Sequence, residues 1–271
     1  MGISDFGEMA RLTKIAKPDT CVITNIGTCH LENLGDRDGV LKAKTEIFQS
    51  MKPNGHIVLN GDDDKLITVR EYNGVKPVFF GLNSERDVYA DQIESKGLKG
   101  VACRIHLGED AFDVLVPTPG IHMVYNALAA AAVGRIYGLT IEEIRRGIES
   151  LETIRGRFKM IETDKFLVVD DCYNANPVSM KASLDVLSKA GGRKIAVLGD
   201  MGELGEDEKQ LHHEVGTYAG TLPIDLLFCV GILSGKLAEG AKKQNPALTV
   251  KHYATREEMI EALLATVNEG D

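Results

Sequence analysis

The sequence predicts an α/β protein with two consecutive domains, a mixed-sheet domain over residues 1–153 and a parallel-sheet domain over residues 154–271. The 271 residues are long for one domain, and 44% of them are hydrophobic, which suffices for two cores. In the second half, short apolar runs alternate with amphipathic stretches, as expected for parallel strands joined by helices. In the first half the runs are less regular, which favours a mixed sheet.

Charge and cysteine usage argue against several classes of protein. The net charge is -9 and no basic run occurs, which argues against nucleic acid as the main partner, although a local pocket could still bind a nucleotide. The five cysteines are scattered without a CxxC pair, which indicates reduced thiols in a cytoplasmic protein. The sequence shows no signal peptide and no apolar run of membrane-spanning length, so we expect no membrane partner.

In the first half, helical spacing and short apolar runs predict helices and strands in turn. The expected elements are a helix over 5–14, a strand over 20–25, a helix over 38–51, a strand over 56–59, an acidic loop over 60–64, β-rich runs over 77–81, 101–107 and 111–116, and a helix over 123–137. We interpret the three β-rich runs as a small antiparallel patch. A last helix should start at Thr140, which opens a capping-box sequence.

In the second half the alternation is regular, and it predicts a parallel sheet with helices on both faces. The expected strands cover 166–170, 194–199, 226–230 and 249–253, and the expected helices cover 177–190, 206–220, 233–243 and 255–268.

The densest group of polar side chains follows the expected strand at 166–170. Asp170 and Asp171 end that strand, and Tyr173, Asn174 and Asn176 fill the turn before a helix that starts at Pro177. Ligands bind beyond the carboxyl ends of strands in open parallel sheets, so this turn is a candidate binding site. A polar loop with an asparagine helix cap explains the same residues equally well.

Three weaker groups lie in the first half. His30, with Glu32, follows a buried strand and could bind a metal or transfer protons, although a lone histidine is more often structural. Lys44 lies on the next helix, where a solvated face is the plainer explanation. His122 and Asn126 are four residues apart at a helix start, which suits a nucleotide base or phosphate, or simply capping and a buried amide.

The chain contains no Walker A phosphate loop. The nearest match, residues 231–237, has one residue too few between its glycines and no Ser or Thr after Lys236. We interpret this segment as a strand–turn–helix connection.

Taken in order, the motifs are more specific than any one of them. They are NIGTCHLENLG at 25–35, AKTEIF at 43–48, GIHMVYNALAA at 120–130, GR at 156–157, DDCYNANPVS at 170–179 and LGDMGELG at 198–205. This series resembles the Mur ligase family of ATP-dependent amide ligases, in particular the branch that adds D-alanyl-D-alanine. The resemblance covers nearly the whole chain, and the last two motifs are the most specific to that branch.

The resemblance implies part of a central, ATPase-type ATP-binding domain followed by a Rossmann-like domain. Family members carry an N-terminal domain and a phosphate loop ahead of the region that matches here, and at least one strand after it. We therefore expect a truncated chain without the N-terminal domain, the phosphate loop and the last strand or strands.

The implied activity is that of an acid–amino-acid ligase in peptidoglycan precursor synthesis. It would use ATP and Mg²⁺ to join D-alanyl-D-alanine to UDP-MurNAc-tripeptide through an acyl phosphate, in a monomeric protein, and we expect this chain alone to be inactive. Two alternatives remain open: another Mur-type ligase, such as folylpolyglutamate synthetase, and a non-catalytic module that binds a nucleotide or dipeptide.

The resemblance also implies roles for single residues. His30 would be a Mg²⁺ ligand and Lys44 would bind Mg²⁺ as a carbamate, and both would be catalytic. The implied ATP contacts are His122, Asn126, Arg157, Asp171, Tyr173, Asn174 and Asn176. The implied contacts of the D-alanyl-D-alanine pocket are Asp200, Met201, Glu203 and Leu204.

Overall fold

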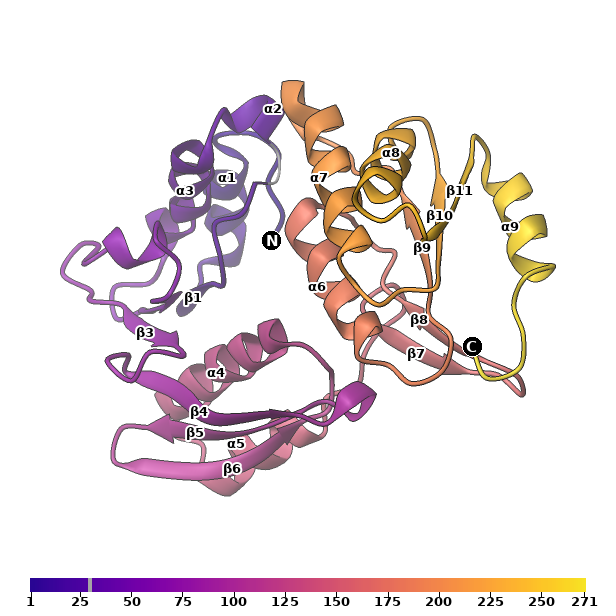
Figure 1. The fold of residues 1–271 in the computed structure, drawn as a ribbon. Coiled ribbons are helices and arrows are strands. Elements are labelled where there is room, and N and C mark those ends of the chain that lie inside the picture. The colour runs from indigo at the N-terminus through magenta and orange to yellow at the C-terminus, as the bar shows by residue number, and fades with distance from the viewer. Residues whose placement is uncertain (29–30) are drawn as a thin grey trace. The chain divides into compact units, whose positions relative to one another are not determined.

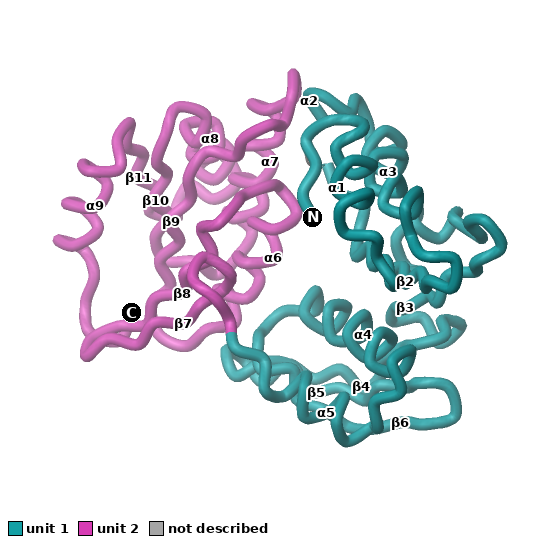
Figure 2. Tube along the Cα trace, turned by 180° about the vertical axis from the view of Figure 1, so that it is seen from behind, with its two compact units in different colours: residues 1–152 teal, residues 153–271 magenta. Residues whose placement is uncertain are grey.

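The computed structural model describes residues 1–28 and 31–271 and divides the chain into two compact units (Figure 2). Unit 1 covers Met1–Glu152 and unit 2 covers Thr153–Asp271. Buried apolar residues form two clusters in unit 1 and one in unit 2 among the described residues. Among the described residues, no helix is both long and apolar enough to cross a membrane.

Unit 1 is built on a mixed sheet in which neighbours in sequence are neighbours in space (Figure 1). Its strands are β1 (Thr20–Ile23), β2 (His56–Asn60), β3 (Val78–Gly81), β4 (Val88–Ser95), β5 (Val101–Leu107) and β6 (Asp110–Val116). The pairs from β1 to β4 are parallel, and the pairs β4–β5 and β5–β6 are antiparallel. The predicted mixed sheet is therefore confirmed.

Two details of the predicted antiparallel patch are wrong. Residues 78–81 pair in parallel with β2 and β4 and so do not belong to it. Its third strand is instead β4, which the sequence did not reveal. The register of β4 shifts between Asp91 and Glu94, which breaks the alternation of apolar and polar residues that marks a strand.

The helices of unit 1 cover two adjoining cores. They are α1 (Glu8–Ala16), α2 (Leu31–Leu34), α3 (Arg37–Thr45), α4 (Ile121–Ile136) and α5 (Ile141–Glu149), with 3₁₀ turns at Glu46–Ser50, Leu66–Thr68 and Gly97–Lys99. Apolar residues of α4 and α5 pack on the inward residues of β4–β6, and those of α1 and α3 pack around β1 and β2. The predicted capping box is confirmed: Thr140 N donates to Glu143 Oε2 at 2.8 Å, and Glu143 N donates to Thr140 Oγ1 at 3.3 Å.

Unit 2 contains a parallel sheet and a separate two-stranded ribbon. The parallel sheet has the order β11 (Thr249–Tyr253), β10 (Leu226–Val230), β9 (Ile195–Gly199). The prediction that residues 166–170 join this sheet is wrong, because β8 (Leu167–Asp170) pairs antiparallel with β7 (Lys159–Glu162). A tight turn closes the ribbon: Thr163 N donates to Phe166 O at 3.0 Å, and Phe166 N donates to Thr163 Oγ1 at 3.0 Å.

The helices of unit 2 follow the predicted order: α6 (Pro177–Ser188), α7 (Glu208–Gly220), α8 (Ser234–Gln244) and α9 (Arg256–Leu264), with a 3₁₀ turn at Gly205–Asp207. Helices α7 and α8 lie side by side (Figure 1). Two glycines let their backbones meet. A Cβ atom on Gly216 would lie 1.9 Å from Leu237 O, and one on Gly240 would lie 2.2 Å from His213 O. Any side chain at either position would therefore force the two helices apart.

Candidate functional site

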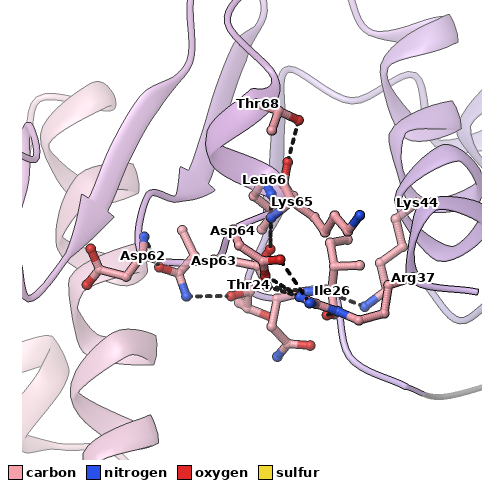
Figure 3. A network of polar contacts seen from close by, with 12 residues as sticks. Thr24, Ile26, Arg37, Lys44, Asp62, Asp63, Asp64, Lys65, Leu66 and Thr68 are labelled. Carbon is pink, nitrogen blue, oxygen red and sulfur yellow. Dashed lines mark hydrogen bonds and ion pairs between the residues drawn. The ribbon is translucent and has the colours of Figure 1, made fainter.

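In unit 1, the backbone that follows β1 is held by side chains from other segments (Figure 3). Asn60 Nδ2, at the end of β2, donates to Thr24 O at 3.0 Å. Lys44 Nζ, on α3, donates to Asn25 O at 2.8 Å. Both bonds satisfy carbonyl groups that a loop would otherwise leave to water.

The next residue, Ile26, is held at both of its backbone groups. Its N–H donates to Asp63 Oδ2 at 2.7 Å, and its carbonyl accepts from Arg37 Nε at 3.0 Å. The Asp63 side chain is only 8% exposed, and its Oδ1 also accepts from Lys65 N and Leu66 N. Asp63 therefore joins the loop after β1 to the loop after β2.

Arg37 has a second, more exposed partner. Its Nη1 donates to Asp64 Oδ2 at 3.0 Å, and this pairing lowers the pKa of the Asp64 carboxyl below its ordinary value, chiefly through the hydrogen bond. The Asp64 side chain is 65% exposed, so solvent screens the pair. We therefore expect the buried Asp63 bonds to contribute more to holding the loop than the Asp64 ion pair does.

Of the two predicted metal ligands, the structure describes only Lys44. His30 lies outside the described residues. Lys44 is half-buried on α3 and is bound to the loop that precedes it. Among residues 1–28 and 31–271, no three His, Cys, Asp or Glu side chains are grouped to hold a metal. The ammonium of Lys44 offers Mg²⁺ no oxygen ligand, so Lys44 could take part only as the carbamate, and the metal site stays a prediction.

A second link in unit 1 runs from the acidic loop to the first turns of α4. Tyr125 Oη donates to Asp62 Oδ2 at 3.1 Å, and Asp62 Oδ1 accepts from Arg86 Nε at 3.0 Å. Burial, and then the Asp62 charge, raise the pKa of Tyr125 to about 12. Neither residue was predicted as part of a site, because a tyrosine on an apolar helix and an aspartate in an acidic loop carry no specific signal.

The two α4 residues predicted to contact ATP lie at the start of that helix. Gly120 precedes α4 with φ 104°, and a Cβ there would lie 2.4 Å from the imidazole of His122. Asn126 is exposed one turn later, and its Nδ2 donates to Met123 Sδ at 3.5 Å. The structure therefore places His122 and Asn126 within one helical turn, as their spacing predicts, and their role as ligand contacts stays a prediction.

In unit 2, hydrogen bonds join the segment before β7 to the turn after β8, and we call this set of bonds the clasp. Gly156 N donates to Asp170 Oδ2 and Phe158 N donates to Asp171 Oδ1, each at 3.1 Å. Tyr173 N returns a bond to Gly156 O at 3.0 Å. The clasp brings the Gly-Arg motif to the carboxyl end of β8.

The clasp brings two predicted site residues, both exposed, into contact. The Arg157 guanidinium lies 4.0 Å from the centre of the Tyr173 ring, a cation–π contact. Both side chains are exposed, Tyr173 by 69%. A charge and an aromatic face held side by side suit an anionic ligand that also carries a flat group.

The other predicted residues of this turn divide into structural and exposed positions. Asp171 Oδ2 accepts from Ser183 Oγ at 2.5 Å. Asn176 caps α6 through a reciprocal pair of bonds with Ser179. Asn174 is exposed, and its Oδ1 accepts only the neighbouring Ala175 N–H, at 2.8 Å, among the bonds that the structure describes. The helix-cap interpretation is thus right for Asn176. Asn174 does not cap the helix.

Asp170 lies at the base of the same turn and is stabilised as a carboxylate. The Cys172 thiol donates to Asp170 Oδ1 at 2.9 Å, and this bond is the largest cause that lowers the Asp170 pKa. The same bond raises the pKa of the Cys172 thiol, so this exposed cysteine is held in its protonated form.

At the end of β9, Asp200 binds the start of a neighbouring helix. Its Oδ2 accepts from Ile232 N at 3.0 Å, and its Oδ1 accepts from Ser234 N at 2.6 Å. The unpaired N–H groups at the start of α8 therefore already hold a carboxylate. This confirms that residues 231–237 join a strand to a helix, and it shows why the segment has no need of a phosphate.

The four residues proposed for the dipeptide pocket face in different directions. Met201 and Leu204 are 1% and 3% exposed, and their side chains pack in the core of unit 2. Asp200 and Glu203 are exposed, and Glu203 has φ 58°. Any contact of Met201 or Leu204 with a ligand would therefore come from the backbone.

A buried histidine that the sequence did not reveal supports this loop. His212, on α7, is fully buried; its Nε2 accepts from Met201 N at 2.9 Å and its Nδ1 lies 2.6 Å from Glu208 O. A single histidine in an amphipathic stretch does not indicate that its ring will bind the backbone of a preceding loop.

Two depressions on unit 1, of about 360 Å³ and 400 Å³, are lined by none of the predicted site residues. The candidate site is therefore defined by the two clasped loops and the motifs rather than by either of these hollows.

Comparison with known protein families assigns both units. Residues 1–134 match the Mur ligase middle domain, and residues 156–271 match the Mur ligase glutamate ligase domain. Together these matches define an ordered pair of ligase domains. The chain belongs to the Mur ligase family.

The most similar relatives include enzymes with one name, UDP-N-acetylmuramoyl-tripeptide–D-alanyl-D-alanine ligase. The chain is 35% identical to that of Bacillus subtilis (strain 168) over 274 residues, covering 100% of this chain and 59% of the relative. It is 33% identical to that of Escherichia coli (strain K12) over 233 residues, covering 85% of this chain and 52% of the relative. The chain thus spans little more than half the length of these relatives.

Solved structures give the same result. MurF from Acinetobacter baumannii superposes with a TM-score of 0.88 at 34% identity, covering 98% of this chain and 57% of that one. MurF ligase from Thermotoga maritima, solved in complex with ADP, superposes with a TM-score of 0.82 at 29% identity, covering 99% of this chain and 60% of that one. The resemblance inferred from the motifs is confirmed.

Proposed function

We propose that this chain supplies the nucleotide-binding and acceptor-binding parts of an ATP-dependent ligase of peptidoglycan precursor synthesis. The ligase would join D-alanyl-D-alanine to UDP-MurNAc-tripeptide in the cytoplasm. The observation that carries the proposal is the clasp of unit 2, which sets Arg157 over Tyr173 at the end of β8. The names of the similar enzymes and the ADP bound to the Thermotoga maritima relative support it.

In this reaction, ATP would phosphorylate the terminal carboxylate of the tripeptide, and the dipeptide amine would then displace phosphate from the acyl phosphate. Arg157 would offset negative charge on the phosphates. Asp171 would hold the ribose, with Tyr173, Asn174 and Asn176 beside it, and Asn126 with His122 would contact the base. Mg²⁺ would supply further charge compensation, with Lys44 as a carbamate and His30 as the proposed ligands.

A polypeptide of these 271 residues alone should bind nucleotide without turning it over. It contains no Gly-rich phosphate loop with its lysine, which is a large part of the machinery of phosphoryl transfer. Calorimetric titration with ADP should detect binding, and Arg157→Ala should weaken it. Phosphate release with ATP and both substrates should stay at background.

Two results would count against the proposal. Turnover comparable to that of the full-length relatives would show that the phosphate loop is dispensable. Failure of the wild-type chain and of Arg157→Ala to differ in ADP affinity would remove Arg157 from the nucleotide site.

A further inference from the structure

The loop that joins β9 to α7 is anchored on both sides of one exposed turn. Asp200 is bonded to the start of α8, and the side chains of Met201 and Leu204 are buried in the core. Between these anchors, Gly202 and Glu203 are exposed. The turn itself is a conformation that few side chains adopt, since Glu203 has φ 58°. Something other than intrinsic preference must hold it.

His212 provides an anchor for the backbone inside this loop. The Met201 N–H can only donate, so the Nε2 atom that it meets at 2.9 Å must be unprotonated. The Glu208 carbonyl can only accept, so Nδ1, at 2.6 Å from it, must carry the proton. The imidazole is therefore a neutral Nδ1–H tautomer with both nitrogens satisfied and no access to water.

We propose that His212 is the positioning residue of the acceptor-binding loop. In this role it fixes the Met201 backbone so that the Gly202–Glu203 turn is preformed for D-alanyl-D-alanine. This inference rests on the proposed function, because it takes the 200–205 loop as the acceptor site. The histidine itself touches no ligand, since it is fully buried beneath the loop.

Two packed helices support this anchor. His212 lies on α7, and the Asp200 anchor lies at the start of α8. The two helices touch through Gly216 and Gly240 without intervening side chains. The loop is thus bound to two helices that are themselves in backbone contact. If the imidazole were displaced, the loop would lose the bond from Met201 N to His212 Nε2, which ties its backbone to α7.

The first test needs no ligand. The ¹⁵N spectrum of the wild-type chain should show one histidine as a neutral Nδ1–H tautomer, and that signal should be absent in His212→Gln. The Met201 amide should exchange slowly with solvent in the wild type and in His212→Gln, whose side-chain oxygen keeps an acceptor near the Nε2 position. It should exchange fast in His212→Leu, which fills the space but accepts no hydrogen bond. A protected Met201 amide in His212→Leu would overturn the proposal.

The second test uses D-alanyl-D-alanine as the probe. Calorimetric or NMR titration should show that His212→Leu binds about tenfold more weakly than the wild type, as expected for a lost hydrogen bond of about 1.4 kcal/mol, and that His212→Gln largely restores binding. The matched control is His213→Gln on the same helix. The described hydrogen bond of the His213 ring is to Thr217 and not to the loop, so this variant should bind the dipeptide as the wild type does.

The outcomes separate the two hypotheses. If the wild type binds the dipeptide and His212→Leu binds it equally well, the positioning role is wrong while the proposed function stands. If the wild type shows no shift of any amide in residues 200–205, the acceptor site itself is wrongly assigned, and the positioning role falls with it.

Discussion

At the residue scale, several polar side chains of the candidate site bind the backbone of the chain itself. Asp63 and Arg37 hold Ile26, Asp200 holds the start of α8, and His212 holds Met201. The side chains of Asp63 and His212 are buried, and buried polar groups cost free energy unless they are paired, so their bonds both stabilise the fold and fix a loop. The residues that remain exposed beside them, such as Tyr173 and Asn174, are the ones available to a ligand.

The link between Tyr125 and Asp62 predicts a dependence of stability on alkaline pH. Because the pKa of Tyr125 is raised from 10.0 to about 12, the folded state favours the neutral phenol. The stabilisation that this neutral phenol gives the folded state is complete below pH 10 and is lost as the pH rises through about 12. Tyr125→Phe should be less stable than the wild type by about 1 kcal/mol at neutral pH, since one hydrogen bond to a partly exposed carboxylate is lost.

Urea unfolding of the wild type and Tyr125→Phe across the alkaline range would test this. The difference in free energy of unfolding should shrink as the phenol ionises. A difference that stays constant through that range would show that Tyr125 does not titrate in contact with Asp62.

The two asparagines of the turn before α6 should separate stability from binding. Asn176 caps α6, and its replacement by alanine should lower the free energy of unfolding by about 1 kcal/mol. Asn174→Ala should leave stability within about 0.5 kcal/mol of the wild type, as exposed substitutions usually do, and should weaken ADP binding. Thermal unfolding and ADP titration of both variants measure the two effects. Equal binding by Asn174→Ala and the wild type would remove Asn174 from the nucleotide site.

At the element scale, local signals predicted most of the helices and failed for strands that lack such signals. Thr140 and Pro177 mark helix starts through capping and a fixed φ, both of which act within a few residues. Strand β4 carries a register shift and β7 has no buried residue, so neither shows the alternation that identifies a strand. Pairing partners are decided by contacts between distant segments, which is why β8 was assigned to the wrong sheet.

The same distinction applies to the site. The nucleotide-side motifs were visible as dense polar turns at strand ends, and the clasp brings Arg157, Asp171 and Tyr173 together. The supporting residues Asp62, Tyr125 and His212 were not visible, because each acts across the fold on a backbone group or a side chain of another segment. Met201 and Leu204 were assigned by motif position alone, which does not reveal that their side chains turn inward.

The loop that follows β1 is an element whose conformation should depend on one aspartate. Asp63→Ala removes three backbone bonds from a side chain that is 8% exposed, and we expect it to cost about 2 kcal/mol or more. Asp64→Ala is the matched control. Its side chain is 65% exposed and pairs with Arg37 at the surface, so this substitution should cost clearly less stability than Asp63→Ala.

Chemical unfolding of both variants would measure these costs, and amide exchange at Ile26 would report on the loop itself. Similar stabilities for Asp63→Ala and Asp64→Ala would show that the buried bonds do not hold the loop.

At the scale of the whole molecule, the chain has separate cores in its two units. Leu128 is fully buried in unit 1 and Leu227 is fully buried in unit 2. Truncation of a buried leucine to alanine typically costs about 2–5 kcal/mol. We therefore expect Leu128→Ala to destabilise unit 1 alone and Leu227→Ala to destabilise unit 2 alone.

Hydrogen exchange measured residue by residue would resolve the two units in one experiment. Loss of protection confined to the mutated unit would confirm that each folds around its own core. Equal loss in both units for either variant would show that they unfold as one cooperative body.

The contact of α7 with α8 has a consequence for how this sequence can vary. Positions 216 and 240 accept no Cβ atom, because each would meet a carbonyl oxygen of the facing helix. Neither position belongs to any motif assigned to a ligand, yet a substitution at either would separate the helices that support the 200–205 loop. Among related chains these two glycines should therefore change as rarely as the residues that touch substrate, and a variant library screened for folding should recover almost nothing but glycine at both.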